Sequence, residues 1–130
     1  MLYTVETDKD LETVCTDLQA AVSRWKFGVL HIHKLKETMA QKGVDLEADC
    51  RIFEVCNPHQ AKRVLSQRME ISTALPCRIS VFQEGGKVKL STLRPTAMIG
   101  MFGQEGLEEV AQEVEVALFG IMDEAAGKQA

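Results

Sequence analysis

The sequence predicts an α+β domain in which helices cover one face of a mainly antiparallel β-sheet. Several short segments alternate apolar and polar residues, as β-strands do, and longer segments repeat apolar residues at helical spacing. Gly85-Gly86 lies between two alternating segments and predicts a tight hairpin turn. The elements follow in the order strand, helix, strand, strand, helix, strand, strand, helix, which is typical of helices packed on one side of an antiparallel sheet.

Length and charge limit the possible functions. The chain has 130 residues, 45% apolar and 26% charged, which fits a single domain, 1–130, that folds without disulfides or a metal. Only residues 127–130 are expected to be frayed. The net charge of -4 does not suit a protein that neutralises phosphates, so we expect no nucleic-acid partner.

The location of the protein can also be predicted from the sequence. Residues 1–6 lack a basic segment followed by an apolar core, so they do not resemble a secretory signal. The longest apolar run, 116–122, is far shorter than the roughly 20 residues of a membrane span. We therefore expect a cytoplasmic protein with no membrane partner and with reduced cysteines.

The first two elements are a strand and an amphipathic helix. The strand is Leu2–Glu6, and Thr7 and Asp8 offer side-chain oxygens that would cap the following helix. The apolar residues of this helix fall on one face: Leu11, Val14, Cys15, Leu18, Val22 and Trp25. Within this stripe Cys15 is expected to be a small buried residue.

The next strand, Phe27–Lys36, carries two of the histidines. Because side chains alternate across a pleated strand, His31 and His33 share a face. The same alternation places Val29 with the histidines, and it places Leu30 and Ile32 on the opposite face. Residues 35–43 can then form a short helix that Gly43 closes.

Cys50–Cys56 is expected to be the strand that follows. Phe53 and Val55 share one face, and Ile52, Glu54 and Cys56 share the other. Because an unpaired carboxylate is costly to bury, the face of Glu54 is expected to be the more open one.

Asn57 and Pro58 mark the start of the second long helix. Asn57 is expected to cap it and Pro58 to occupy its first position, where the missing N–H is not needed. The inward face consists of Ala61, Val64 and Leu65. The helical pattern breaks at 69–75, and Pro76 favours an extended restart.

A hairpin and a helix complete the chain. The hairpin strands are Cys77–Glu84 and Lys87–Leu93. The helix has the most regular apolar spacing in the sequence, at Leu107, Val110, Ala111, Val114, Ala117, Leu118, Ile121 and Met122. Val116 and Phe119 lie outside this stripe and widen the apolar surface, which indicates deeper burial or a partner chain, with contact with a flanking loop as the alternative.

Three segments carry a recognisable pattern: FEVCNPHQAKRVL (53–65), LPCRISVFQEGGKVKLSTLRPTAMI (75–99) and FGVLHIHKLKETMAQKGVDL (27–46). In these segments the chain resembles the bacterial and archaeal domain-of-unknown-function 302 proteins, and the resemblance covers nearly all of it. The resemblance implies a curved antiparallel sheet of the TATA-binding-protein-like kind, often assembled as a homodimer. It implies no established activity and assigns no catalytic residues. His31-Ile32-His33 departs from the pattern and argues against one uniform function for the family.

Cys56 is the first candidate for a functional side chain. A thiol beside a helix N-terminus is exposed to the helix dipole, which stabilises a thiolate. Cys56 would then act as a nucleophile in single-cysteine redox or sulfur-transfer chemistry, or as a metal ligand. The alternative is a buried thiol selected for its size at a tight strand-to-helix junction.

A metal site is the second candidate. His31 and His33 stand about 6.5 to 7 Å apart along a strand, so both imidazoles can reach one metal ion. Glu54 and Cys56 would complete the set from the neighbouring strand. The alternative is a pair of solvated or interface histidines.

The sequence contains no common catalytic motif, such as G-x-S-x-G, a P-loop, G-x-G-x-x-G or H-E-x-x-H, so an ordinary enzyme is not favoured and no cofactor is identified. We therefore predict a homodimeric domain that binds a small ligand or a transition metal on the helix-free face of its sheet. Thiol chemistry at Cys56 and a purely structural or regulatory dimer are the alternatives.

Overall fold

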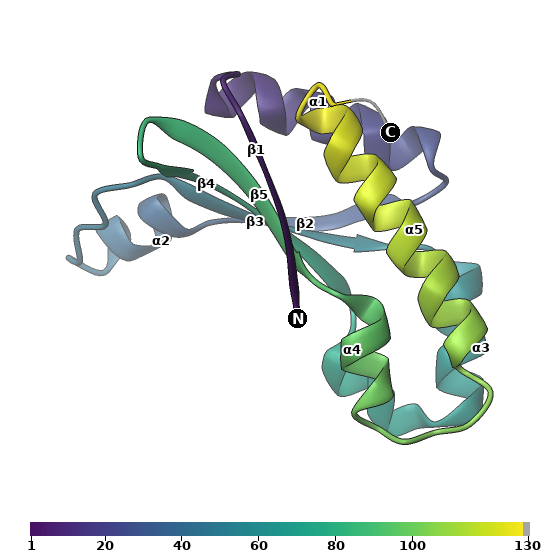
Figure 1. Cartoon of the computed structure of the whole chain (residues 1–130). Coiled ribbons are helices and arrows are strands. Elements are labelled where there is room, and N and C mark those ends of the chain that lie inside the picture. Colours follow the sequence, from purple (N-terminus) through teal and green to yellow (C-terminus); the bar gives the residue numbers. More distant parts are fainter. Residues whose placement is uncertain (129–130) are drawn as a thin grey trace.

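The computed structural model describes residues 1–128 and contains a five-stranded antiparallel sheet in the order β1-β5-β4-β3-β2 (Figure 1). The strands are β1 (Leu2–Thr7), β2 (Gly28–Lys34), β3 (Cys50–Cys56), β4 (Cys77–Glu84) and β5 (Lys87–Leu93). The helices are α1 (Leu11–Arg24), α2 (Leu35–Gln41), α3 (Pro58–Gln67), the 3-10 helix η1 (Met69–Ala74), α4 (Pro95–Gly100) and α5 (Glu108–Ala125). The α+β class and the predicted order of elements are confirmed.

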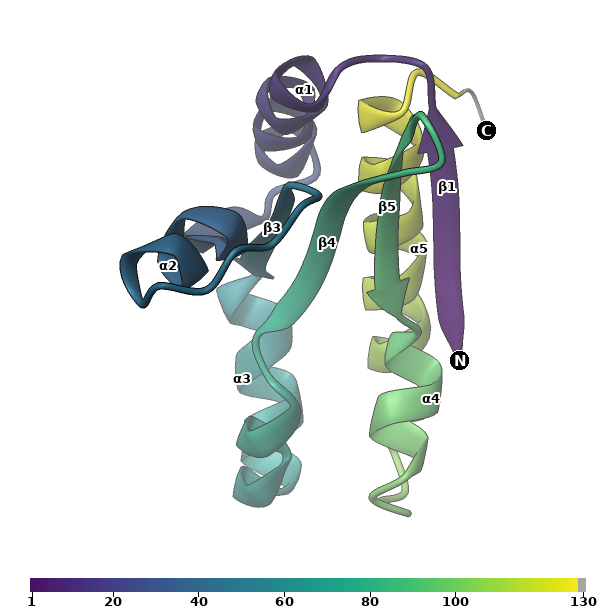
Figure 2. The same ribbon diagram turned by 90° about the vertical axis from the view of Figure 1, so that its left-hand side faces the viewer.

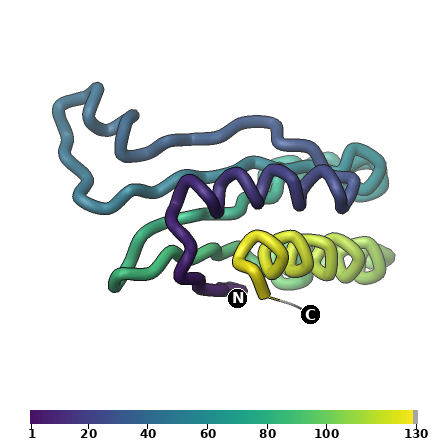
Figure 3. The backbone as a smooth tube through the Cα atoms, turned by 90° about the horizontal axis from the view of Figure 1, so that it is seen from above, coloured from purple at the N-terminus to yellow at the C-terminus, as the bar shows by residue number. Residues whose placement is uncertain are grey.

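The two longest helices cover one face of the sheet. Figure 2 views the opposite face, with the strands in front of α5, and Figure 3 shows α1 and α5 side by side. The predicted stripe of α5 is buried at Val110, Ala111, Val114, Ala117, Leu118, Ile121 and Met122. α2 projects from the β2 and β3 edge on the side away from α5 (Figures 1 and 2). The face of β1, β5 and β4 opposite the long helices is left uncovered.

α3 and α4 extend beyond one end of the sheet, where both contact α5 (Figure 1). Each begins with a proline at its first turn, as expected for Pro58 and not predicted for Pro95. The predicted break at 69–75 corresponds to η1, which contacts both α3 and α4. These helices form an apolar extension of the core at this end of the molecule.

Two local predictions were wrong. The register of β2 against β3 shifts between Val29 and His31, because Leu30 is an extra residue in a β-bulge. Val29 and Ile32 therefore pack together against the core, and Val29 does not share the face of the histidines. The cap of α1 is Asp10, whose carboxylate accepts a hydrogen bond from Thr13 N–H at 3.2 Å, and not the predicted Thr7 or Asp8.

The C-terminal end remains hydrogen-bonded as far as it is described. Gly127 N–H donates to the carbonyl of Glu124, and Lys128 N–H donates to that of Asp123. The predicted fraying at residues 129 and 130 lies outside the described residues. None of the helices in residues 1–128 is long and apolar enough to span a membrane.

Candidate functional site

The first region of interest is a cluster of side chains from β2, β3 and β4 on the face of the sheet opposite α1 and α5, which we call the open-face cluster: His31, His33, Glu54 and Arg78. The strand register places His31 opposite Glu54, and Glu54 opposite Arg78. The His31 and His33 rings meet edge to face, with centroids 4.4 Å apart. His33 Nε2 lies 3.3 Å from Glu54 Oε2, and Arg78 Nη2 lies 3.4 Å from the same oxygen. The sequence correctly placed both histidines and Glu54 on one face.

Glu54 is the central group of this cluster. Its side chain is only 17% exposed, whereas that of Arg78 is 57% exposed. The hydrogen bond with His33, helped by the charge of Arg78, holds the pKa of Glu54 below its ordinary value. The carboxylate is therefore charged at neutral pH and already engaged by two partners.

Cys56 does not join this cluster. It pairs with Gly28 at the end of β3, whereas Glu54 pairs with His31. Its side chain instead lines a cavity that lies among the helices at this end of the sheet. In the described part of the chain, no group of three or more His, Cys, Asp or Glu side chains is placed to hold a metal ion. The predicted set of His31, His33, Glu54 and Cys56 is thus not assembled, because the strand end directs the thiol elsewhere.

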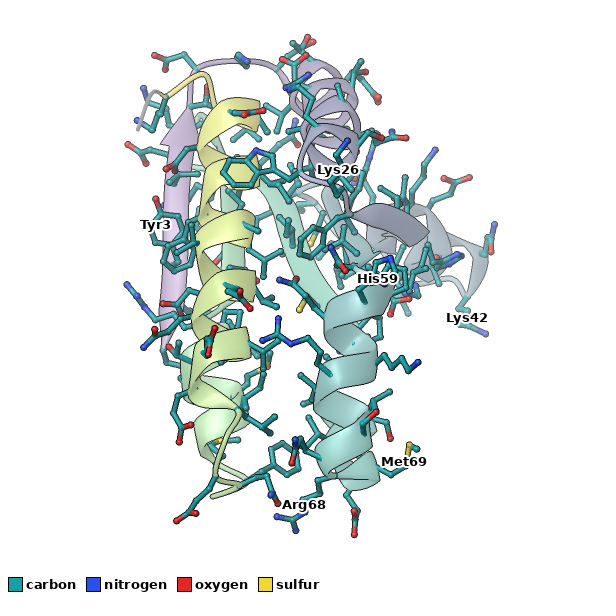
Figure 4. The ribbon with its side chains drawn as sticks, turned by 90° about the vertical axis from the view of Figure 1, so that its right-hand side faces the viewer. Tyr3, Lys26, Lys42, His59, Arg68 and Met69 are labelled. Atoms are coloured by element: carbon teal, nitrogen blue, oxygen red, sulfur yellow. The ribbon has the colours of Figure 1, made fainter. Side chains whose placement is uncertain are left out.

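That cavity, which we call the α3–α5 cavity, has a volume of about 300 Å³. It is bounded by the ends of β3 and β4 and by α3, η1, α4 and α5. Figure 4 views this side of the molecule, with His59 labelled at the start of α3 and side chains from α3 and α5 projecting into the space between the two helices. Its apolar wall includes Phe27, Val55, Val64, Leu75, Met98 and Ile99. None of the described residues that line it is charged.

Asn57 lines the cavity, and both ends of its side-chain amide make hydrogen bonds within the fold. Asn57 Oδ1 accepts hydrogen bonds from the N–H groups of His59 at 3.0 Å and Gln60 at 3.1 Å. Its Nδ2 donates to the carbonyl of Lys26 at 3.3 Å. The predicted cap is confirmed, and it occupies two of the N–H groups at the start of α3.

The environment of Cys56 does not activate the thiol. Cys56 is half-buried, and burial raises its pKa above the ordinary value. The neighbouring Cys77 also lines the cavity, and burial, with a smaller contribution from Cys56, raises the pKa of Cys77 to about 11. The helix N-terminus that was expected to stabilise a thiolate is already capped by Asn57. Both groups are therefore neutral thiols at pH 7.

Gln60 is the residue of this cavity that sequence reasoning missed. Its Oε1 is buried and has no hydrogen-bond partner among residues 1–128. Gln60 precedes Val64 by four residues, so both belong to the inward side of α3. An amide at a position of the apolar stripe was the available signal, but the stripe alone does not reveal whether the amide has a partner.

Comparisons with known proteins agree with the resemblance seen in the sequence. The model of the family "Domain of unknown function DUF302" matches residues 3–125. The chain is similar to an uncharacterized conserved DUF302 protein from Bacillus stearothermophilus, whose crystal structure superposes with a TM-score of 0.91 at 32% identity. The match covers 95% of this chain and 97% of that one. No curated protein matches the chain. The family match over nearly the whole length shows that this chain belongs to the DUF302 family, a family of unknown function.

Proposed function

We propose that this domain binds a small, uncharged and largely apolar molecule in the α3–α5 cavity. The observation that carries the proposal is the cavity itself, about 300 Å³ with an apolar wall and no charged residue among the described residues that line it. This volume is at the lower end of the range of small-molecule sites, which are typically concave and mostly apolar. A ligand that removes this wall from water gains about 25 cal/mol for each Å² of apolar surface buried.

A filling substitution tests this proposal. Ala61 lines the cavity from α3, and Ala20 is an exposed alanine in α1. We expect 2-naphthol to bind the wild type in an NMR titration, and Ala61→Leu to weaken binding at least tenfold because the added side chain occupies the cavity. Ala20→Leu should leave the affinity unchanged. Absence of binding at millimolar 2-naphthol, or equal binding by both variants, would refute the proposal.

The open-face cluster supports a second candidate function, the binding of a transition metal or a small ligand. The supporting observation is the contact of His33 with both His31 and Glu54 on the face of the sheet opposite α1 and α5. Metal analysis of protein purified without a His-tag tests it. We expect any bound metal to be lost in His31→Ala/His33→Ala and retained in His59→Ala, since His59 is exposed on α3 outside the cluster. Retention of the metal by the double variant would exclude the histidines as ligands.

Single-cysteine thiol chemistry at Cys56 is the third candidate, and its support is that the thiol is partly accessible. The raised pKa opposes it, because the thiolate is the reactive form. We expect Cys56 to be alkylated at pH 7 no faster than a model thiol, with the rate increasing only above the ordinary thiol pKa. Fast alkylation at pH 7 that disappears in Cys56→Ser would favour the thiol candidate.

A cytoplasmic location completes the proposal. All four cysteines are free in the described chain, which is consistent with a reducing compartment. Fractionation of the cells that make the protein tests this assignment.

A further inference from the structure

Gln60 lines the α3–α5 cavity, and its side-chain Oε1 is buried without a hydrogen-bond partner among residues 1–128. Buried polar groups normally have a hydrogen-bond partner, because losing water without replacing it costs free energy. The backbone of Gln60 takes part in the cap of α3, since its N–H donates to Asn57 Oδ1 at 3.1 Å. Among the described residues, the side-chain Oε1 of Gln60 therefore makes no hydrogen bond that supports the fold.

We propose that the ligand of this cavity is a small neutral molecule with an apolar body and one hydroxyl group, which hydrogen-bonds to the side-chain amide of Gln60. This inference rests on the proposed function of the cavity and specifies the chemical class of its ligand.

The other polar groups of the cavity wall do not compete with Gln60 for this contact. Both ends of the Asn57 amide are used, by α3 and by the carbonyl of Lys26. Ser72 lies in η1 and is exposed to solvent. Cys56 and Cys77 carry neutral thiols, which are weak donors and acceptors. Gln60 is thus the strong hydrogen-bonding group that a buried ligand would meet.

None of the described residues that line the cavity is charged, and this determines that the polar group of the ligand is neutral. A carboxylate or an ammonium would lose its water and find no countercharge, which is strongly unfavourable. A side-chain amide offers an acceptor oxygen at one end and donor hydrogens at the other. A hydroxyl can donate a hydrogen bond to the amide oxygen or accept one from the amide N–H groups, so it fits Gln60 in either orientation of the amide.

Three matched probes and two variants test this inference. The probes are 2-naphthol, naphthalene and 2-naphthoate, which share an aromatic body and differ in the polar group. The variants are Gln60→Met, which keeps the length of the side chain and removes the amide, and Gln67→Met, which makes the same change at an exposed position of α3. Affinities are measured by NMR titration of the full chain.

In the wild type we expect 2-naphthol to bind about tenfold more tightly than naphthalene, which corresponds to one net hydrogen bond. A purely hydrophobic cavity would give the reverse order, because naphthalene is the more apolar molecule. Gln60→Met should abolish the preference while still binding naphthalene, and Gln67→Met should retain it. 2-Naphthoate should bind at least 100-fold more weakly than 2-naphthol.

The outcomes separate the two levels of the proposal. If naphthalene binds as tightly as 2-naphthol, or if Gln60→Met keeps the preference, the hydroxyl inference is overturned and cavity binding stands. If 2-naphthoate binds as well as 2-naphthol, the requirement for a neutral ligand is overturned. If neither neutral probe binds the wild type, the cavity function and the inference both fail.

Discussion

At the scale of single residues, Asn57 links two parts of the chain that are distant in sequence. One end of its amide caps α3, and the other end holds the carbonyl of Lys26, whose φ of 65° places it in the left-handed region. Lys26 is in the tight turn between α1 and β2. The side chain thereby fixes the entry of β2 relative to the start of α3, and the Cys-Asn-Pro sequence has a structural explanation that does not require chemistry.

Asn57→Ala is expected to destabilise the protein by about 1 to 2 kcal/mol, because the N–H groups of His59 and Gln60 lose their acceptor. The free energy of unfolding is measured by urea denaturation. His59→Ala, at the exposed neighbouring position, is the control and should change stability little. Equal stability of the two variants would show that the cap contributes nothing.

Glu54 gives a pH-dependent prediction at the same scale. Its folded-state pKa is lowered from the ordinary value of 4.5, first by the hydrogen bond with His33 and then by the charges of His33 and Arg78. A carboxylate with a lowered folded-state pKa stabilises the fold at pH values above its unfolded-state pKa. This stabilisation is lost as the pH falls through the folded-state pKa. We expect Glu54→Gln to be less stable than the wild type near pH 6, and the difference to shrink progressively below about pH 4.5.

Urea denaturation of both proteins from pH 7 to pH 3 measures this difference. Glu84→Gln, at an exposed carboxylate of β4 that forms an ion pair with Lys89, is the control. A stability difference for Glu54→Gln that does not change with pH would contradict the electrostatic explanation.

At the scale of elements, the contact between α1 and α5 depends on a glycine. A Cβ atom at Gly120 of α5 would lie 2.2 Å from Trp25 Cζ2, just after the end of α1. The Trp25 ring also donates a hydrogen bond through Nε1 to Glu124 Oε1 at 3.1 Å. The glycine therefore allows the indole to lie against the helix backbone, and the tryptophan joins the two long helices.

Gly120→Ala is expected to destabilise the protein by about 1 to 3 kcal/mol, because the indole must move to admit the new methyl group. Helix propensity alone predicts the opposite, a stabilisation of up to about 1 kcal/mol. Gly100→Ala is the matched control, because a Cβ there meets nothing within 4 Å. Urea denaturation distinguishes the two effects, and a stabilised Gly120→Ala variant would refute the role of the contact.

At the scale of the whole molecule, homodimer formation stays a prediction. Val116 is 64% exposed on α5, whereas the Phe119 ring stacks on Tyr3 of the same chain with centroids 3.8 Å apart. Of the two residues considered for a partner contact, Val116 is thus the more available one. An isolated exposed valine is common in monomers, so the oligomeric state needs measurement.

We expect wild-type protein to sediment as a dimer at micromolar concentrations and Val116→Glu to shift it toward the monomer, because the interface would have to bury a charge. Gln112→Glu adds the same charge at another exposed position of α5 and should remain dimeric. A monomeric wild type would dismiss the dimer, and a dimeric Val116→Glu variant would place the interface elsewhere.

The sequence by itself determined the features that depend on local periodicity and local backbone chemistry. The stripe of α5, the Asn57 cap and the Gly85-Gly86 hairpin could be predicted because each involves residues within one or two turns of the chain. The shared face of His31 and His33 followed from strand alternation in the same way.

Only the tertiary structure decided how these elements meet. Strict alternation could not anticipate the bulge at Leu30, because the extra residue is defined by the pairing of β2 with β3. The α3–α5 cavity forms because α3, α4 and α5 pack together from distant parts of the chain. This packing determines that Cys56 lies apart from Glu54 and that Gln60 Oε1 lacks a partner. A buried polar atom finds a hydrogen-bond partner only among its neighbours in space, and residue spacing along the sequence does not specify those neighbours.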